Sequence, residues 1–123
     1  MPRRRAGLAG VVAVLGMLAG GDCSLAASAP CQPIRFEAGH ASTTLRGMAP
    51  VEAVACYSMA TGRGQTATLK VTAGGNTVFT IDGLIDAQDD YSFTTAHKTY
   101  RILVGQLMRA VSPEAFVLTV TVK

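Results

Sequence analysis

The residue with the clearest chemical potential is Arg109, which lies in a short stretch between two apolar, strand-like segments. This stretch, Met108–Glu114, contains Ser112 and Pro113. Ser-Pro favours a turn, and proline cannot donate to a strand ladder, so the stretch is expected to be a loop. An arginine on a loop held by a rigid scaffold is suited to recognising an acidic group on a partner. The alternative is a plain connection that closes a sheet.

Other polar residues do not form a catalytic pattern. His40 and His97 lie in separate turns, and Ser58 or Ser92 would have to join them to form a triad without any nucleophile-elbow motif. Gly62–Gly64 lacks the third glycine and the strand-to-helix context of a nucleotide-binding loop, so it is interpreted as a turn. We therefore expect a protein that is not an enzyme.

The oxygen-rich residues of the middle of the chain offer a weak metal-site pattern. They are Asp82, Asp86, Asp89 and Asp90. Their spacing differs from that of an EF-hand loop, which favours a charged surface connection over a Ca²⁺ site. Neither CxxC nor HxxxH spacing occurs in the chain. No metal and no cofactor is expected.

The elements that must position Arg109 are two strands. The last segment alternates, with one face formed by Phe116, Leu118, Val120 and Val122 and the other by Val117, Thr119, Thr121 and Lys123. The preceding segment, Tyr100–Leu107, places Tyr100, Ile102 and Val104 on one side. A period of two with β-branched and aromatic residues is typical of half-buried strands. The two segments are predicted to form an antiparallel hairpin with Arg109 near its tip.

The remaining chain reads as short strands separated by turns. Expected strands are Ile34–Ala38, Ser42–Arg46, Val54–Met59, Thr66–Thr72, Thr77–Ile81 and Tyr91–Thr94. Gly47–Pro50 is expected to end a strand, Gly74–Asn76 to form a hairpin turn, and Asp82–Asp90 to form a longer connection. Because strands recur every 8–12 residues or so without a helical period, the prediction is an all-β antiparallel sandwich of about seven to eight strands, or a small barrel.

The N-terminal segment has the pattern of a secretory signal peptide. Arg3–Arg5 precede an apolar run over residues 6–20, and small residues follow. We expect cleavage after Ala26, because the other option, after Ala29, would place a proline just after the cut bond. Cys23 would then be removed with the leader. A retained membrane anchor is the rival interpretation, but the apolar run is short for a span of about 20 residues. The predicted organisation is a signal peptide at 1–26, an extended segment at 27–33 and a β-sandwich domain at 34–123.

Export has consequences for the cysteines and the charge. The two remaining cysteines, Cys31 and Cys56, are predicted to form a disulfide, with two free thiols as the alternative. The whole chain has 11 basic and 8 acidic side chains, of which three arginines and Asp22 precede the expected cut. The exported form would be nearly neutral, without a basic patch interleaved with aromatics, so nucleic-acid binding is not expected. No membrane attachment is expected after cleavage.

Several segments of the chain together resemble the periplasmic inhibitors of goose-type lysozyme and the broader bacterial pre-peptidase C-terminal-like β-sandwich domains. They are Ile34–Phe36 with Ala38-Gly39, Ser42–Gly47, Tyr57 before Gly64–Thr66, and Tyr100–Ile102 leading to Leu107–Ala110. The likeness extends over about residues 34–122, and its most specific part is the last.

This resemblance implies a periplasmic or secreted bacterial binding protein that blocks the active-site cleft of a muramidase with a loop. Arg109 matches the family's loop arginine, and the implied contacts also include Met108, with Arg101 and Lys98 as electrostatic support. A lysozyme cleft carries catalytic carboxylates, with which a guanidinium can pair. The alternative is an envelope module without inhibitory activity that binds a glycan or another protein. Arg109 favours the inhibitor, whereas the Ser112–Glu114 sequence favours the alternative.

Overall fold

A computed structural model describes residues 30–123, of which Cys31–Lys123 form one compact unit. The predicted leader, its cleavage site and Cys23 lie outside the described residues. The strands are β1 (Gln32–Pro33), β2 (Ser42–Ala49), β3 (Ala55–Thr61), β4 (Thr66–Ala73), β5 (Thr77–Ile81), β6 (Ile85–Gln88), β7 (Asp90–Thr94), β8 (Lys98–Gln106) and β9 (Glu114–Val122). The described part of the chain has no helix long and apolar enough to cross a membrane.

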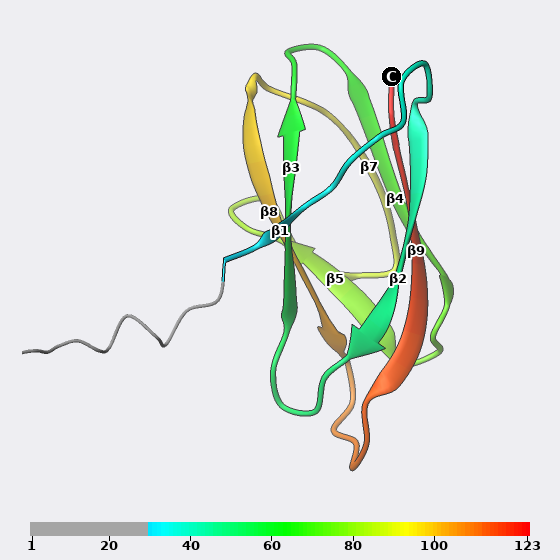
Figure 1. Cartoon of the computed structure of the whole chain (residues 1–123). Coiled ribbons are helices and arrows are strands. Elements are labelled where there is room, and N and C mark those ends of the chain that lie inside the picture. The colour runs from blue at the N-terminus through cyan, green and yellow to red at the C-terminus, as the bar shows by residue number, and fades with distance from the viewer. Residues whose placement is uncertain (1–29) are drawn as a thin grey trace, which may run out of the picture. The chain divides into compact units, whose positions relative to one another are not determined.

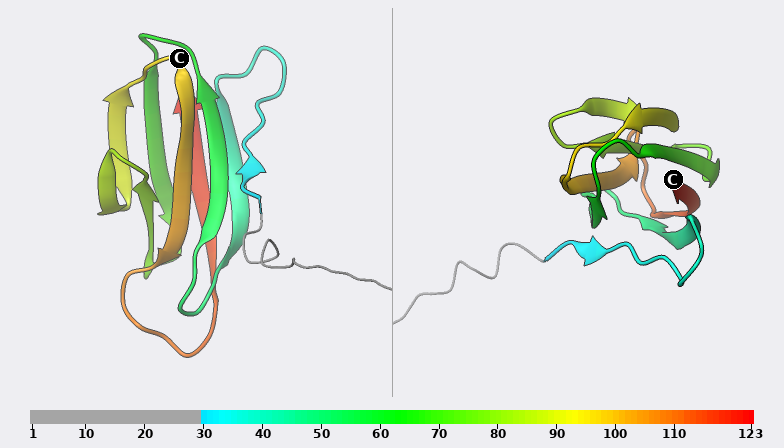
Figure 2. Two further views of the ribbon diagram at one scale, coloured as in Figure 1. Left: turned by 90° about the vertical axis from the view of Figure 1, so that its left-hand side faces the viewer. Right: turned by 90° about the horizontal axis from the view of Figure 1, so that it is seen from above.

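The strands form two sheets that pack face to face, as the views along and across the layers show (Figures 1 and 2). The five-stranded sheet has the order β1-β3-β8-β5-β6, and the four-stranded sheet has the order β2-β9-β4-β7. All strand pairs are antiparallel except the two-residue pairing of β1 with β3. The predicted all-β sandwich is confirmed, with nine strands in residues 30–123 where about seven to eight were expected.

Side chains from the inner faces of both sheets form the core between them. The buried apolar residues are Ile34, Ala49, Tyr57, Met59, Ala67, Leu69, Phe79, Ile81, Tyr100, Ile102, Val104, Phe116, Leu118 and Val120. The predicted inner faces of β8 and β9 are therefore confirmed, with Val122 packed at the edge of the core. Burying each large apolar side chain stabilises the fold by about 1.5–3 kcal/mol, which explains why the alternation is so regular.

The predicted C-terminal hairpin is wrong. β8 lies between β3 and β5 in one sheet, whereas β9 lies between β2 and β4 in the other. The connection between β8 and β9 therefore crosses from one layer to the other. The predicted hairpin at Gly74–Asn76 is wrong for the same reason, because β4 and β5 also belong to different sheets. The inner faces of both sheets contribute to one core, and in both cases strands adjacent in sequence are placed in different layers of it.

Several strand boundaries also differ from the predictions, by one or two residues at most strands and by more at three places. Ile34–Ala38 is not a strand: it follows the short edge strand β1, runs toward β2 and packs Ile34 and Phe36 against the core (Figure 1). β2 continues to Ala49 instead of ending at Arg46, and Ala49 is fully buried. The acidic segment Asp86–Asp90 is part of β6 and β7 and not a single loop.

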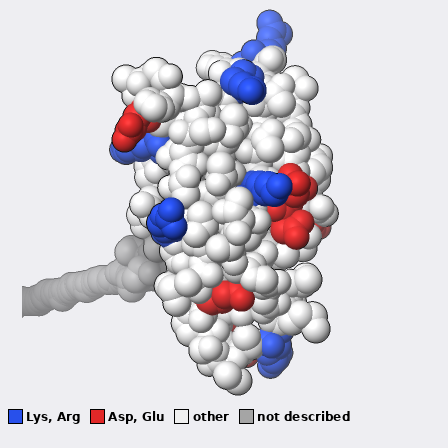
Figure 3. Space-filling model, turned by 90° about the vertical axis from the view of Figure 1, so that its right-hand side faces the viewer, with Lys and Arg blue, Asp and Glu red and all other residues white. Residues whose placement is uncertain are grey.

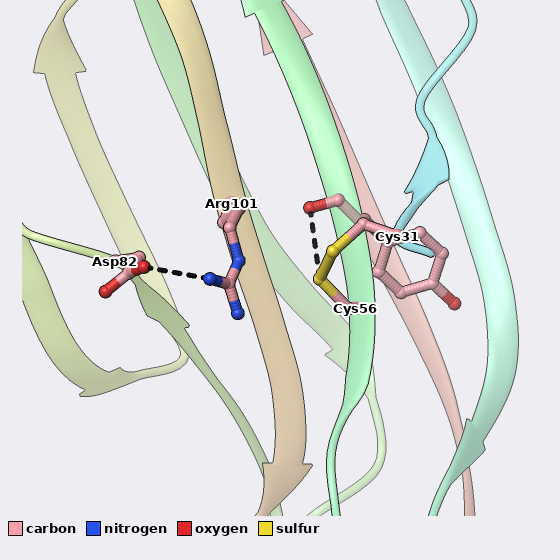
Figure 4. Close-up of a disulfide and its surroundings, with 5 residues drawn as sticks. Cys31, Cys56, Asp82 and Arg101 are labelled. Carbon is pink, nitrogen blue, oxygen red and sulfur yellow. Dashed lines mark hydrogen bonds and ion pairs between the residues drawn. A yellow bond between two sulfur atoms is a disulfide. The ribbon is translucent and has the colours of Figure 1, made fainter. Parts of the chain in front are cut away.

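The predicted disulfide is present. Cys31 and Cys56, whose Cα atoms are 4.6 Å apart, join the segment before β1 to β3 (Figure 4). The amide of Ile34 donates to the carbonyl of Ser58 at 2.8 Å, which holds the residue after β1 against β3 as well. A cross-link between residues 25 apart in sequence restricts the unfolded chain, which stabilises the fold by about 3 kcal/mol in the chain-entropy view.

Candidate partner-binding site

Two loops project side by side at one end of the sandwich, and one of them carries Arg109. The β2–β3 loop spans residues 50–54 and the β8–β9 loop spans residues 107–113, and both lie at the lower end in the views of Figures 1 and 2. We call the exposed surface of these two loops, together with Met48, the loop end. The opposite end of the sandwich carries the β1–β2, β3–β4 and β7–β8 loops and the C-terminus.

Asn76, in the turn between β4 and β5, attaches the β8–β9 loop to the sandwich. Its side-chain nitrogen donates to the carbonyl of Met108 at 2.8 Å and to Oε1 of Gln106 at 2.9 Å. Its side-chain oxygen accepts from the amide of Met108 at 2.9 Å. The amide of Leu107 donates to the backbone carbonyl of Asn76 at 2.8 Å. The start of the loop is thus held by the neighbouring turn at both backbone and side chain.

Glu114 fixes the far side of the same loop. Its carboxylate accepts from the amide of Asn76 at 3.0 and 3.2 Å and from the hydroxyl of the buried Thr77 at 2.6 Å. Glu114, which belongs to the Ser112–Glu114 sequence that favoured the alternative function, is therefore engaged within the protein. Charge-assisted hydrogen bonds of this kind are stronger than neutral ones.

Gln106 completes the attachment. Its side-chain nitrogen donates to the carbonyl of Ala49 at 3.1 Å and to that of Ser112 at 3.0 Å. It thereby joins the end of β2, the end of β8 and the last part of the loop. Sequence reasoning missed Asn76, Gln106 and this role of Glu114. The signal that the sequence offered for this role was a polar residue at or next to each strand end that adjoins the loop.

Arg109 projects from this fixed loop into solvent. Its guanidinium lies 3.4 Å from a carboxylate oxygen of Glu52 in the β2–β3 loop, and both side chains are mostly exposed, at 85% and 66%. The two loops enclose a shallow depression of about 350 Å³. It is lined by Pro50, Val51, Glu52, Ala53, Val54, Gln106, Met108, Arg109 and Ala110. The arginine therefore stands at the edge of a mainly apolar hollow.

The loop end is also unusually apolar for a solvent-exposed surface. Its exposed large apolar side chains are Met48, Val54, Leu107, Met108 and Val111, with Val111 99% exposed. Leu84 is the one other exposed large apolar residue in the described range. A second depression, on the outer face of the five-stranded sheet, shares Val54 and Gln106 with the first, so the apolar surface continues onto the sheet. A gathering of apolar side chains rimmed by polar ones is typical of a protein interaction site.

The structure brings two of the four predicted contact residues together. Met108 and Arg109 share the loop end, whereas Lys98 begins β8 and lies about 26 Å along that strand from its other end. The ammonium of Lys98 lies 4.9 Å from the ring centre of Tyr100. Arg101 points outward from β8 and pairs with Asp82 at 3.5 Å (Figure 4). Neither Lys98 nor Arg101 lines the depression beside Arg109.

The other polar groups of residues 30–123 are dispersed. Within that range, no three His, Cys, Asp or Glu residues are placed to hold one metal ion. His40 lies 4.0 Å from Glu37, its neighbour in an exposed turn, and the hydroxyl of Ser92 is paired with that of Thr68 at 2.8 Å. On the outer face of the four-stranded sheet, charges of both signs are scattered over a largely uncharged surface (Figure 3).

The fold is shared with solved structures of lysozyme inhibitors. The chain is similar to PliG of Aeromonas hydrophila, a periplasmic inhibitor of g-type lysozyme, with a TM-score of 0.65, 24% identity, and coverage of 76% of this chain and 96% of that one. It is also similar to PliG of Salmonella Typhimurium (TM-score 0.61, 17% identity, coverage 78% and 100%). A mutant of the Escherichia coli inhibitor gives a TM-score of 0.57 at 19% identity, with coverage of 74% and 96%.

No protein-family model and no curated protein sequence matches the chain. At identities of 24% and below, the structural likenesses establish the fold. The resemblance to these inhibitors that the sequence suggested is thereby confirmed in three dimensions, over most of the described residues.

Proposed function

We propose that this protein is exported to the bacterial periplasm or secreted, and that it inhibits a goose-type lysozyme by inserting the loop end into the active-site cleft. The proposal includes a signal peptide at 1–26, an extended segment at 27–33 and the β-sandwich at 34–123. The disulfide fits an oxidising compartment outside the cytoplasm. Two of the solved structures that share the fold are periplasmic inhibitors of g-type lysozyme.

The observation that carries the proposal is the anchored, exposed Arg109 flanked by apolar side chains. Three residues of the sandwich, Asn76, Gln106 and Glu114, hold its loop, so little conformational entropy remains to be lost on binding. Met108 and Val111 supply apolar area on either side. A muramidase cleft combines carboxylates with surfaces that bind sugar rings, and a desolvated guanidinium–carboxylate pair there would be strong.

Arg109 would act as the central contact and Met108 as its apolar neighbour. Arginine is among the residue types enriched at binding hot spots, where truncation costs about 2 kcal/mol or more. Lys98 and Arg101 lie outside the loop end, so their contribution would be limited to long-range attraction, which salt weakens. The alternative function, an envelope module that binds a glycan or another protein, would use the same surface without blocking an enzyme.

The test is to export the protein from its full-length precursor, purify it oxidised and titrate it against a goose-type lysozyme, with a chicken-type lysozyme for comparison. The intact mass of the product also reports whether cleavage follows Ala26. Arg109→Ala is expected to weaken inhibition by about thirtyfold or more. Arg63→Ala, in the exposed β3–β4 turn at the opposite end, is the matched control and should leave inhibition unchanged.

A folded wild-type protein that leaves the goose-type enzyme fully active would overturn the proposal and favour the envelope module. Equal inhibition by wild type and Arg109→Ala would retain an inhibitor but remove the contact assigned to the loop end.

A further inference from the structure

We infer that Glu52 is an intramolecular competitor for Arg109: its carboxylate pairs with the guanidinium in the free protein, and a carboxylate of the partner must displace it. The inference rests on the proposed function and deepens it, because it names the group that Arg109 recognises and a residue that sets the strength of that recognition. The two side chains lie 3.4 Å apart, on opposite walls of the depression at the loop end.

The backbone of Glu52 supports a role beyond that of an ordinary surface acid. Its φ is +54°, in the left-handed region that side chains other than glycine and asparagine adopt at some energetic cost. A glycine or asparagine would relieve that cost, yet the position carries a glutamate whose carboxylate lies beside Arg109. Residues held in unfavourable backbone conformations concentrate at binding and switch regions.

The exposure of the pair makes displacement feasible. Ion pairs between exposed side chains contribute little, because water solvates both partners and salt screens them. A carboxylate inside an enzyme cleft would meet the same guanidinium with water excluded, where the attraction is much stronger. A partner can therefore replace Glu52 at small cost, and Glu52 lowers affinity without abolishing it. The negative charge of Glu52 also repels the approaching carboxylate of the partner and so slows association.

The Arg109 guanidinium can pair with either of two acids: Glu52 in the free protein, or a carboxylate of the partner in the complex. Among residues 30–123, Glu52 is the only acidic side chain recorded within ion-pair distance of Arg109. The other acid at this end, Glu114, is committed to Asn76 and Thr77. Removal of the Glu52 carboxylate thus leaves Arg109 exposed with no substitute acid among residues 30–123, and a carboxylate of the bound enzyme is the acceptor that we expect it to find.

The experiment measures binding of the exported protein to purified goose-type lysozyme for wild type, Glu52→Gln, Arg109→Ala and the double variant. Glu52→Gln is expected to tighten binding by about two- to fivefold, mainly through faster association. The gain should shrink at about 1 M salt and vanish in the Arg109→Ala background. Glu37→Gln makes the same charge change on an exposed residue at the opposite end and should leave affinity within about 1.5-fold of wild type.

The outcomes separate this inference from the proposed function. Absence of wild-type binding overturns the proposed function. Wild-type binding that Arg109→Ala weakens, together with unchanged or weaker binding of Glu52→Gln, overturns the competitor role and keeps the function. A gain in Glu52→Gln that persists without Arg109, or that Glu37→Gln reproduces, also overturns it, because the effect would then reflect net charge and not release of the arginine.

Discussion

Replacing Asn76 with alanine should loosen the β8–β9 loop without altering any exposed side chain of the loop end. The Asn76 side chain makes three hydrogen bonds, at 2.8–2.9 Å, to Gln106 and to both backbone groups of Met108. A net contribution of about 1 kcal/mol for each bond gives a total of about 3 kcal/mol. Because these groups are partly exposed, water replaces some of the lost bonds, and about 2 kcal/mol is the expected loss. For a domain of this size the melting temperature should fall by about 8–16 °C.

Amide hydrogen exchange followed by NMR provides the sharpest assay, because adjacent amides use different parts of Asn76. The amide of Met108 donates to the side-chain oxygen, whereas the amide of Leu107 donates to the backbone carbonyl. In Asn76→Ala, Met108 should lose most of its protection and Leu107 should retain more. The proposed inhibition should also weaken, because a mobile loop loses more entropy on binding.

The matched control is Thr72→Ala, which removes one long hydrogen bond of 3.5 Å from an exposed hydroxyl to the carbonyl of Val117. It should change the free energy of unfolding by less than about 0.5 kcal/mol. If Asn76→Ala melts like wild type and Met108 keeps its protection, the hydrogen bonds of Asn76 do not position the loop, and the argument for a preformed binding surface is refuted.

Three further outcomes follow from the structure. Gly74→Ala should lower the free energy of unfolding by about 2 kcal/mol or more in chemical denaturation, because φ is +108° and a Cβ there would lie 2.7 Å from Oγ1 of Thr77. The control Gly75→Ala, with open space around the added Cβ, should leave the free energy of unfolding nearly unchanged. Replacing both Cys31 and Cys56 with serine should lower the free energy of unfolding by about 3 kcal/mol, and the wild type measured in reductant should lose a similar amount. Burial raises the pKa of Tyr57, so folding opposes its ionisation and the associated stability is lost as pH rises above the ordinary tyrosine value of 10.0. Tyr57→Phe should therefore show a shallower loss of stability at alkaline pH than wild type, and an unchanged slope would exclude this contribution.

The candidate site was predictable in part. A loop with an exposed arginine followed from Arg109 and Pro113, because turn chemistry is local and charged residues stay in water. The ion pair with Glu52 and the hydrogen bonds of Asn76 were not predictable, since their partners lie 57 and about 30 residues away in sequence. Lys98 and Arg101 were expected to give electrostatic support to Arg109, but an extended strand separates its two ends instead of gathering them.

The sequence by itself determined where most strands form and which face of them is buried, although Ile34–Ala38 is not a strand and β6 was not predicted. Thr77–Ile81 matches its prediction at both ends, and the buried faces of β8 and β9 were correctly assigned, because a period of two is a property of each strand alone. Only the tertiary structure decided which strands pair. A connection such as Leu107–Pro113 can return to the same sheet or cross to the other, and its residues do not distinguish the two paths. In the fold β8 and β9 lie in opposite layers with their apolar faces in the shared core, and the connection that crosses between the layers carries Arg109 to the end of the sandwich beside Glu52.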